Sequence, residues 1–252
     1  MSAINNPYKM QQRDDLLRIM TAPNAGAHNA VYRGKALGGE VTDAQWAAID
    51  AGAFDDLYIG DYWTKGGVNY LVAAFDYFLN TGDPVCTDHH VVIVPEENLY
   101  EARMNSDNIA TGGYAGSEMH TANLERAKNI VKDVFGAHIL RHTIYLTNAV
   151  ANGMASNGAW YESEVDLMCE QMVYGSGIFS PVSDGANVPA NYRVEKSQLP
   201  LFQHDPSCIY HTQQWWLRDV ITGAYFAYVG YGVSNTTNAS NVLGVRPYFC
   251  IY

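Results

Sequence analysis

The last part of the chain opens with Trp215-Trp216-Leu217-Arg218-Asp219 and closes, after a stretch rich in Gly, Tyr, Asn, Ser and Thr, with Leu243-Gly244-Val245-Arg246-Pro247-Tyr248-Phe249. The apolar, β-prone residues 245–251 predict a final strand. Upstream of this region, the pattern gives strands, then two helices and then a long loop region. Strands and helices that are segregated along the chain are typical of an α+β fold. We therefore expect an α+β domain in which the last strand pairs into a sheet.

Periodicity and turn signals place the other elements. The best-marked helix follows Thr42, which can cap it together with Gln45, and Gly52 ends it. A long helix with one apolar face runs from residue 117 or 121 to residue 135, and Gly136 stops it. The sequence further predicts helices over 14–20 and about 162–174, and strands over 56–60, 68–75, 90–94 and 138–145. Residues 1–52 differ in character from the rest, so we expect an N-terminal appendage there and one domain over 53–252.

The composition of the 252 residues excludes several classes of protein. With 48% hydrophobic and 16% charged residues, the chain can bury a sizeable core and is not intrinsically disordered. A net charge of −11 with 15 Lys and Arg residues offers no basic stripe for a phosphate backbone, so a nucleic acid is not an expected partner. No apolar run is long enough to span a membrane, and the N-terminus lacks the pattern of a secretory signal peptide. We expect a protein that is made in the cytoplasm and does not insert into a membrane.

The sequence contains no recognisable catalytic or metal-binding pattern. It has no G-x-S-x-G elbow, G-x-G-x-x-G loop or P-loop. His138 and His142 are four residues apart but follow the helix-stopping Gly136, and the adjacent His89 and His90 would face opposite sides of a strand. We therefore expect no catalytic residue, no metal and no cofactor. Buried free thiols are expected for the four cysteines, which lie far apart and form no ligand cluster: Cys86, Cys169, Cys208 and Cys250.

The motifs at the end of the chain resemble the signature of a known family. Trp-Leu-Arg at 216–218, followed about 25 residues later by Gly-Val-Arg-Pro at 244–247, closely resembles the C-terminal pattern of C-type-lectin-fold proteins whose variable region is rewritten by diversity-generating retroelements. Phage tropism determinants are the best-known members. The resemblance is strongest over 215–252 and extends more weakly to about residue 54. It implies a loop-rich, C-type lectin-like domain, with two helices packed on antiparallel sheets, and a variable ligand-binding region over 219–242.

The residue types of this segment agree with the resemblance. Such retroelements mutate template adenines, and randomising the first two bases of an AAC or AAT codon never gives Lys, Met, Trp, Gln or Glu. At the composition of the whole chain, the 24 residues of 219–242 would hold three to four of these five types. The segment holds none.

The resemblance implies two groups of residues with different roles. Aromatic anchors and small amide and hydroxyl side chains are the residue types that paratopes use, so these residues of the segment are expected to contact the ligand: Asp219, Ile221, Thr222, Tyr225, Phe226, Tyr228, Tyr231, Ser234, Asn235, Thr237, Asn238 and Asn241. Strand alternation would put Tyr225 and Tyr231 on one face and Phe226 and Tyr228 on the other, so we expect only one pair to face the ligand. A rigid scaffold is expected from Trp215, Trp216, Arg218 and Arg246, with an arginine holding loop carbonyls or a buried carboxylate.

The function that the resemblance implies is ligand binding without catalysis. The expected protein is a phage receptor-binding or tail-tip protein in the virion, whose variable surface binds a bacterial surface protein or glycan. The N-terminal appendage would attach it to other virion proteins or to sister subunits, as a trimer or as a monomer.

Two other functions of the same fold stay open. One is an oxidoreductase of the formylglycine-generating type, although the spacing of Cys208 and Cys250 does not resemble the cysteine motif of that family. The other is a calcium-dependent lectin, although the E-P-N, Q-P-D and W-N-D sugar-site motifs are absent from the chain.

Overall fold

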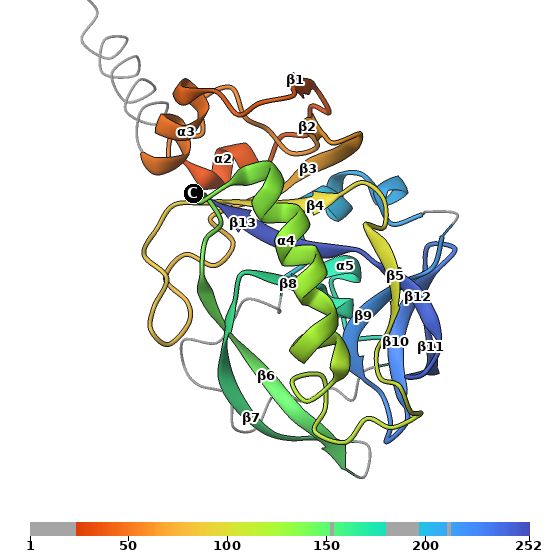
Figure 1. Cartoon of the computed structure of the whole chain (residues 1–252). Helices are drawn as coiled ribbons and strands as arrows, with labels where there is room; N and C mark the ends of the chain where they lie inside the picture. Colours follow the sequence, from red (N-terminus) through yellow and green to blue (C-terminus); the bar gives the residue numbers. More distant parts are fainter. Residues whose placement is uncertain (1–23, 152–153, 180–196, 211–212) are drawn as a thin grey trace, which may run out of the picture.

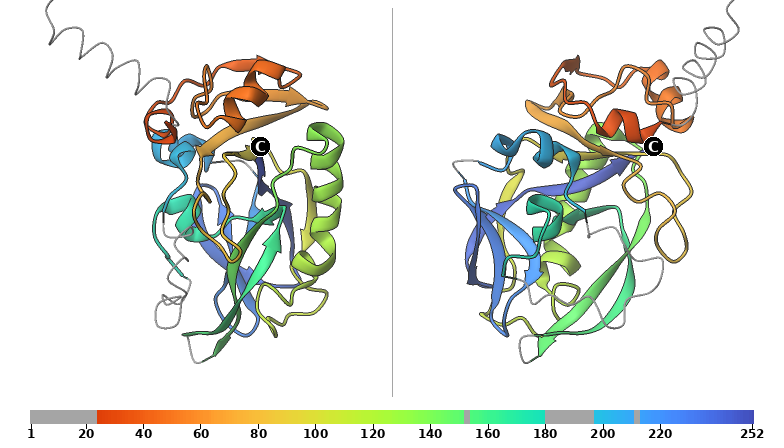
Figure 2. Two further views of the ribbon diagram at one scale, coloured as in Figure 1. Left: turned by 90° about the vertical axis from the view of Figure 1, so that its left-hand side faces the viewer. Right: turned by 180° about the vertical axis from the view of Figure 1, so that it is seen from behind.

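The computed structural model describes residues 24–151, 154–179, 197–210 and 213–252. Two large β-sheets, a two-stranded hairpin and several helices make up an α+β architecture, as the sequence predicts (Figure 1). The N-terminal elements lie at one end of the molecule, and strands β10 and β11 lie toward the other (Figures 1 and 2).

A six-stranded sheet contains the predicted final strand. Its order is β1 (Ala36–Gly38), β2 (Tyr62–Lys65), β3 (Val68–Phe75), β4 (Val91–Pro95), β13 (Pro247–Ile251) and β8 (Val165–Leu167). Every pair is antiparallel except β1 with β2. All residues of β4 and β13 are buried, so these neighbouring strands form the centre of the core. The predictions of strands over 68–75 and 90–94, and of a final strand paired into a sheet, are confirmed.

The second sheet has five strands and carries most of segment 219–242. Its order is β11 (Val233–Asn238), β10 (Tyr225–Gly230), β9 (Trp215–Val220), β12 (Val242–Val245) and β5 (Tyr100–Arg103). Strands β10 and β11 form an antiparallel hairpin, while β12 pairs in parallel with β9. A separate two-stranded sheet joins β6 (His142–Ala151) to β7 (Met154–Ser163).

Two of the predicted helices form where the sequence places them. In α3 (Asp43–Asp50), Thr42 and Gln45 form the expected capping box, and Gly52 follows in the left-handed conformation. Helix α4 (Leu124–Phe135) continues a π-helical turn, η1 (Met119–Asn123), and ends at Gly136. Phe135 packs its ring edge on Tyr70 of β3 at a centroid distance of 5.3 Å, which ties α4 to the six-stranded sheet. Short helices complete the set: α2 (Ala25–Asn29), α5 (Glu170–Tyr174), α6 (Pro200–His204) and η3 (Pro206–Cys208).

Several predicted elements differ in the structure. Residues 56–60 are not a strand, because Asp56 and Gly60 have positive φ angles of 54° and 82° and only Ile59 makes a bridge. The predicted helix over about 162–174 is wrong for its first half, which is strand: β7 ends at Ser163 and β8 follows. The strand predicted over 138–145 begins at His142. The helix predicted over 14–20 lies outside the described residues.

Residues 24–52, the described part of the expected appendage, pack onto the domain. Strand β1 is the edge of the six-stranded sheet, and Ile49 of α3 is fully buried in the core. Asn29 pairs with the backbone of Phe75 through both its amide nitrogen and its oxygen, at 2.9 and 2.8 Å. Residues 24–52 therefore contribute a strand and a buried side chain to the same sheet and core as the residues that follow the expected boundary at 52.

Candidate ligand-binding surface

The two tryptophans predicted as scaffold are fully buried in β9, a strand of the five-stranded sheet. Trp215 and Trp216 are both 0% exposed. The indole N–H of Trp216 donates to the carbonyl oxygen of Ala102 in β5 at 2.9 Å, across the intervening strand β12. Burial of such large rings makes this part of β9 a rigid support for the neighbouring strand β10.

Both predicted arginines hold backbone carbonyl groups, as the sequence suggests. Arg218 donates to the carbonyl of Leu167 at 3.3 Å, which joins β9 to β8 of the other sheet. Arg246 is fully buried and donates to the carbonyls of Pro95 and Cys208, each at 2.8 Å. Its guanidinium lies 5.1 Å from the ring centroid of Trp215. Burial lowers the pKa of Arg246 to about 10, so the guanidinium stays charged at neutral pH.

The hairpin β10–β11 and its flanking turns expose part of the predicted ligand-contacting set. Tyr225 is 42% exposed at the start of β10, and Tyr231, in the turn, is 63% exposed. Thr222, Asn235 and Asn241 are also exposed. A half-buried group lies beside them: Asp219, Ile221, Tyr228, Thr237 and Asn238. The exposed tyrosine pair is thus Tyr225 and Tyr231.

Two members of the predicted set face the interior. Phe226 is 0% exposed and Ser234 is 8% exposed, so neither can contact a ligand in this structure. The Ser234 hydroxyl donates to the carboxylate of Glu170 at 2.5 Å. Phe226 lies on the face of β10 that packs into the core, so its assignment to the ligand-contacting set is wrong, as is that of Ser234.

Glu170 connects segment 219–242 to helix α5. This fully buried carboxylate accepts hydrogen bonds from the backbone N–H groups of Ile178 and Phe179, at 2.7 and 3.0 Å, in addition to the Ser234 hydroxyl. The Asp219 carboxylate in turn accepts the backbone N–H of Glu170 at 2.7 Å. Asp219, a half-buried member of the expected ligand-contacting set, therefore also supports the frame.

Polar side chains also cross-link the exposed rim of the hairpin. The Asn241 amide donates to the Thr237 hydroxyl at 2.6 Å, and the Asn108 amide donates to Asn238 at 3.0 Å. These bonds hold the small polar side chains in defined positions, which lowers the entropy lost when they bind a partner.

The surface includes large exposed side chains that sequence reasoning missed. Tyr210 is 63% exposed, and its Cδ2 atom would lie only 2.7 Å from a Cβ added at Gly232, so it packs against the turn of the hairpin. Ile178 and Phe179 are 49% and 45% exposed and belong to the loop held by Glu170. No sequence signal joins these residues to the segment, because the contacts span many residues and depend on the tertiary fold.

The histidines flagged by their spacing have separate surroundings. His138 stacks on Trp46 at a centroid distance of 4.0 Å, while His142 is buried against Phe78. His89 contacts the Asp76 carboxylate at 2.7 Å. Among the described residues, no group of three or more His, Cys, Asp or Glu side chains could hold a metal ion. Within the same residues, no helix has the length and apolar character needed to cross a membrane.

The four cysteines are free thiols, and all except the half-buried Cys208 are buried. Burial and the nearby Asp205 carboxylate raise the pKa of Cys208 to about 12. Burial also raises the pKa of Cys250. A thiol that stays protonated is a poor nucleophile.

Comparisons of the chain with protein-family models, with curated proteins and with solved structures found no match.

Proposed function

We propose that the chain is a non-enzymatic display protein with a C-type lectin-like frame, located in a phage tail, whose hairpin β10–β11 binds a bacterial surface protein or glycan. The observation that carries this proposal is the division of segment 219–242 into exposed side chains and a buried frame. Within the segment, Tyr225 and Tyr231 are exposed while Phe226 and Ser234 are buried, and the flanking Trp215, Trp216 and Arg246 are buried as well.

The chemistry of the exposed side chains suits recognition of varied partners. Tyrosine provides a large contact area with few rotatable bonds, and Asn and Thr side chains can donate or accept hydrogen bonds. Seventeen of the 24 residues of the segment are exposed or half-buried, and one partner contributes about 20 to 30 residues to an interface of standard size. The segment is therefore large enough to supply most of a binding site.

The division also suits a surface that changes by mutation. Exposed positions such as Tyr225, Tyr231, Asn235 and Asn241 can change with little effect on folding, because surface substitutions usually alter stability by about 0.5 kcal/mol or less. The interactions that fix the hairpin are made mainly by buried residues, several of them outside the segment.

A binding experiment with matched variants tests the display surface. Fluorescently labelled protein is incubated with intact cells of a panel of Gram-negative and Gram-positive bacteria. We expect the double variant Tyr225→Ser/Tyr231→Ser to lose binding to every strain that the unchanged protein binds, because aromatic anchors dominate such interfaces. Tyr252→Ser is the control, since Tyr252 is 43% exposed and lies beyond β13, outside the hairpin. Equal binding by all three proteins would refute the proposed surface.

A second experiment needs no ligand. Libraries that randomise Thr222, Tyr225, Tyr231, Asn235 and Asn241 with adenine-mutated codons should yield mostly folded proteins, as judged by cooperative thermal melting. The neighbouring DNA provides a genetic test: the proposal requires a reverse transcriptase gene and an adenine-rich near-copy of the codons for 219–242.

A further inference from the structure

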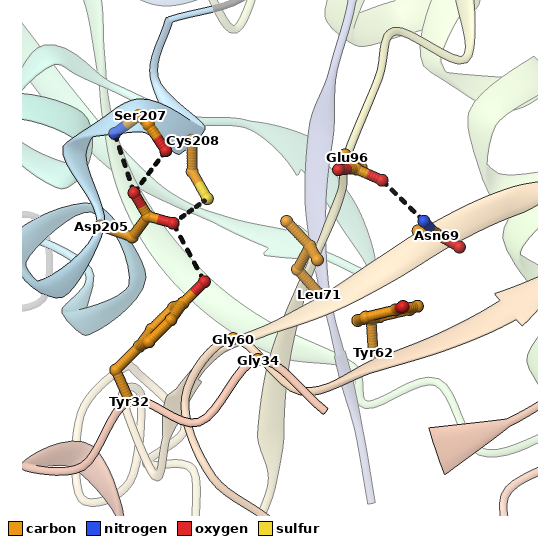
Figure 3. Close-up of a pocket in the computed structure, with 10 residues that line it drawn as sticks. All are labelled: Tyr32, Gly34, Gly60, Tyr62, Asn69, Leu71, Glu96, Asp205, Ser207 and Cys208. Atoms are coloured by element: carbon orange, nitrogen blue, oxygen red, sulfur yellow. Dashed lines mark hydrogen bonds between the residues drawn. The ribbon is translucent and has the colours of Figure 1, made fainter. Parts of the chain in front are cut away.

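A pocket of about 230 Å³ lies away from the hairpin, where the N-terminal segment meets the six-stranded sheet and the 205–208 turn (Figure 3). Its walls are formed by residues from distant parts of the sequence: Tyr32, Gly34, Gly60, Tyr62, Asn69, Leu71, Glu96, Asp205, Ser207 and Cys208. None of these belongs to segment 219–242, so the pocket is separate from the proposed display surface.

Two tyrosine rings stand on opposite sides of the pocket, with Leu71 between them (Figure 3). The position of the Tyr32 ring depends on a glycine. A Cβ added at Gly60 would lie 2.2 Å from the Tyr32 ring, and Gly60 has a φ of 82°, which favours glycine. The backbone thus leaves room for an aromatic ring at this wall.

The charged groups that line the pocket are both carboxylates, those of Glu96 and Asp205. The buried guanidinium of Arg246 lies behind the wall, bonded to the carbonyls of Pro95 and Cys208, so the charge at the pocket remains net negative. Burial together with Asp205 and Glu96 raises the pKa of the Tyr32 hydroxyl and of the Cys208 thiol, each to about 12.

The two carboxylates differ in their hydrogen bonds. Asp205 accepts from the Tyr32 hydroxyl, the Cys208 thiol and both the backbone N–H and the hydroxyl of Ser207, so its oxygens are already well satisfied. Glu96 accepts through Oε2 from the Asn69 amide at 2.7 Å. No hydrogen bond from the described residues reaches Oε1 of Glu96, which leaves that oxygen able to accept from a ligand.

The Asn69 side chain is itself held in place. Its Oδ1 atom accepts the Thr64 hydroxyl at 2.7 Å, so its NH₂ group faces Glu96, and the backbone N–H of Glu96 donates to the Asn69 carbonyl at 2.8 Å. The Glu96 carboxylate is therefore positioned before any ligand arrives, which reduces the entropy lost on binding.

We propose that this pocket binds a primary ammonium group, with Glu96 as its anion and the rings of Tyr32 and Tyr62 beside it. An ammonium group donates three hydrogen bonds, carries the charge that the pocket lacks, and is attracted to aromatic faces. The volume limits the occupant to a small amine or to the end of a lysine side chain. The inference does not rest on the proposed display function.

Titration with matched probes tests the proposal on the unchanged protein. n-Butylammonium chloride should bind saturably with a millimolar dissociation constant, measured by NMR shifts of the backbone amides of residues 34, 60, 69 and 96. 1-Butanol has the same alkyl chain without charge and should not saturate. Nα-Acetyl-lysine methylamide shows whether a lysine side chain on a protein also fits. Saturation by either amine supports the proposal, whereas saturation by neither, or equal binding of 1-butanol, overturns it.

Two variants then distinguish the pocket from general attraction to an acidic protein. Glu96→Gln should weaken n-butylammonium binding about tenfold or more, because it removes the charge that faces the ligand. Glu97→Gln removes the same charge one residue away, at an exposed position outside the pocket, and should leave binding unchanged. If Glu96→Gln fails to fold, Tyr62→Leu provides the test in its place. This variant removes a ring beside the ligand and should weaken n-butylammonium binding several-fold. Equal effects at positions 96 and 97 would overturn the assignment.

Discussion

At the scale of single residues, Trp216 shows how strongly the frame depends on one side chain. We predict that Trp216→Ala destabilises the protein by about 3–5 kcal/mol, because it leaves a cavity and removes the hydrogen bond to Ala102. Tyr225→Ala, on the exposed side of the hairpin, should cost much less. Denaturant midpoints of both variants check the prediction, and similar midpoints would mean that frame and display surface are wrongly assigned.

His142 makes stability depend on pH. Burial is the largest cause that lowers its pKa from 6.5 to about 3, so between these values the unfolded chain binds a proton that the folded chain does not. Stability is therefore lost as the pH falls through this window, by about 2 kcal/mol between pH 7 and pH 5 for this residue. His142→Leu should reduce the loss by that amount, as measured by urea unfolding at both pH values.

The control for the pH experiment is His204→Leu, since His204 is exposed. This variant should lose stability on acidification as the unchanged protein does. If His142→Leu behaves in the same way, another group is responsible for the pH dependence.

At the scale of elements, neighbouring residues of β11 have opposite roles. Ser234 points inward to the Glu170 carboxylate and Asn235 is exposed. Ser234→Ala removes a hydrogen bond to a buried carboxylate and should cost about 1.5–3 kcal/mol, whereas Asn235→Ala should change stability by less than about 0.5 kcal/mol. Thermal melting of the two variants tests this. Equal melting temperatures would contradict a stabilising role for the hydrogen bond between Ser234 of β11 and Glu170 of α5.

Elements with strong local signals could be predicted from the sequence. The capping box of Thr42 and Gln45 and the stop at Gly136 are formed by residues close together in the chain, so local rules placed α3 and the end of α4. The apolar runs of β3 and β4 also suffice to identify these strands.

Where tertiary pairing decides the structure, the sequence was misleading. The apolar positions of 162–174 fit a helix, but Glu162 and Ser163 pair with β6 and Val165–Leu167 pair with β13. For the candidate surface, Tyr225 and Tyr231 are both exposed, but strand alternation is not the reason, because Tyr231 lies in the turn after β10 and Ala227 and Val229 of β10 are buried. Alternation could not show that Phe226 is buried or that Tyr210 lies against the hairpin, because both facts depend on which elements pack together.

At the scale of the whole molecule, Asp61 joins the N-terminal segment to the sheet. This fully buried carboxylate accepts from Arg33 at 2.6 Å and from the backbone N–H groups of Lys35 and Tyr58 at 2.9 and 2.8 Å. We predict that Asp61→Asn costs about 3 kcal/mol, because buried donors lose their charged acceptor. Asp56→Asn is the matched control, since Asp56 also pairs with Arg33 but its side chain is 65% exposed.

Hydrogen exchange gives the measurement for this prediction. In the unchanged protein, the amides of α3 and of β3 should exchange through the same global unfolding, and Asp61→Asn should speed exchange in α3 first. Exchange in α3 that is fast and independent of β3 already in the unchanged protein would show that residues 24–52 fold as a separate unit.

The central position of β13 has a consequence for biosynthesis. A ribosome makes residues 219–242 before it makes β13, and β4 and β8 have β13 between them in the finished sheet. A frameshift or premature stop codon anywhere in 219–242 therefore deprives both strands of their common partner, and the truncated chain exposes core surface that chaperones and proteases recognise. If the segment is diversified as we propose, each new variant must keep its reading frame through 219–242 before it can complete the six-stranded sheet and be displayed.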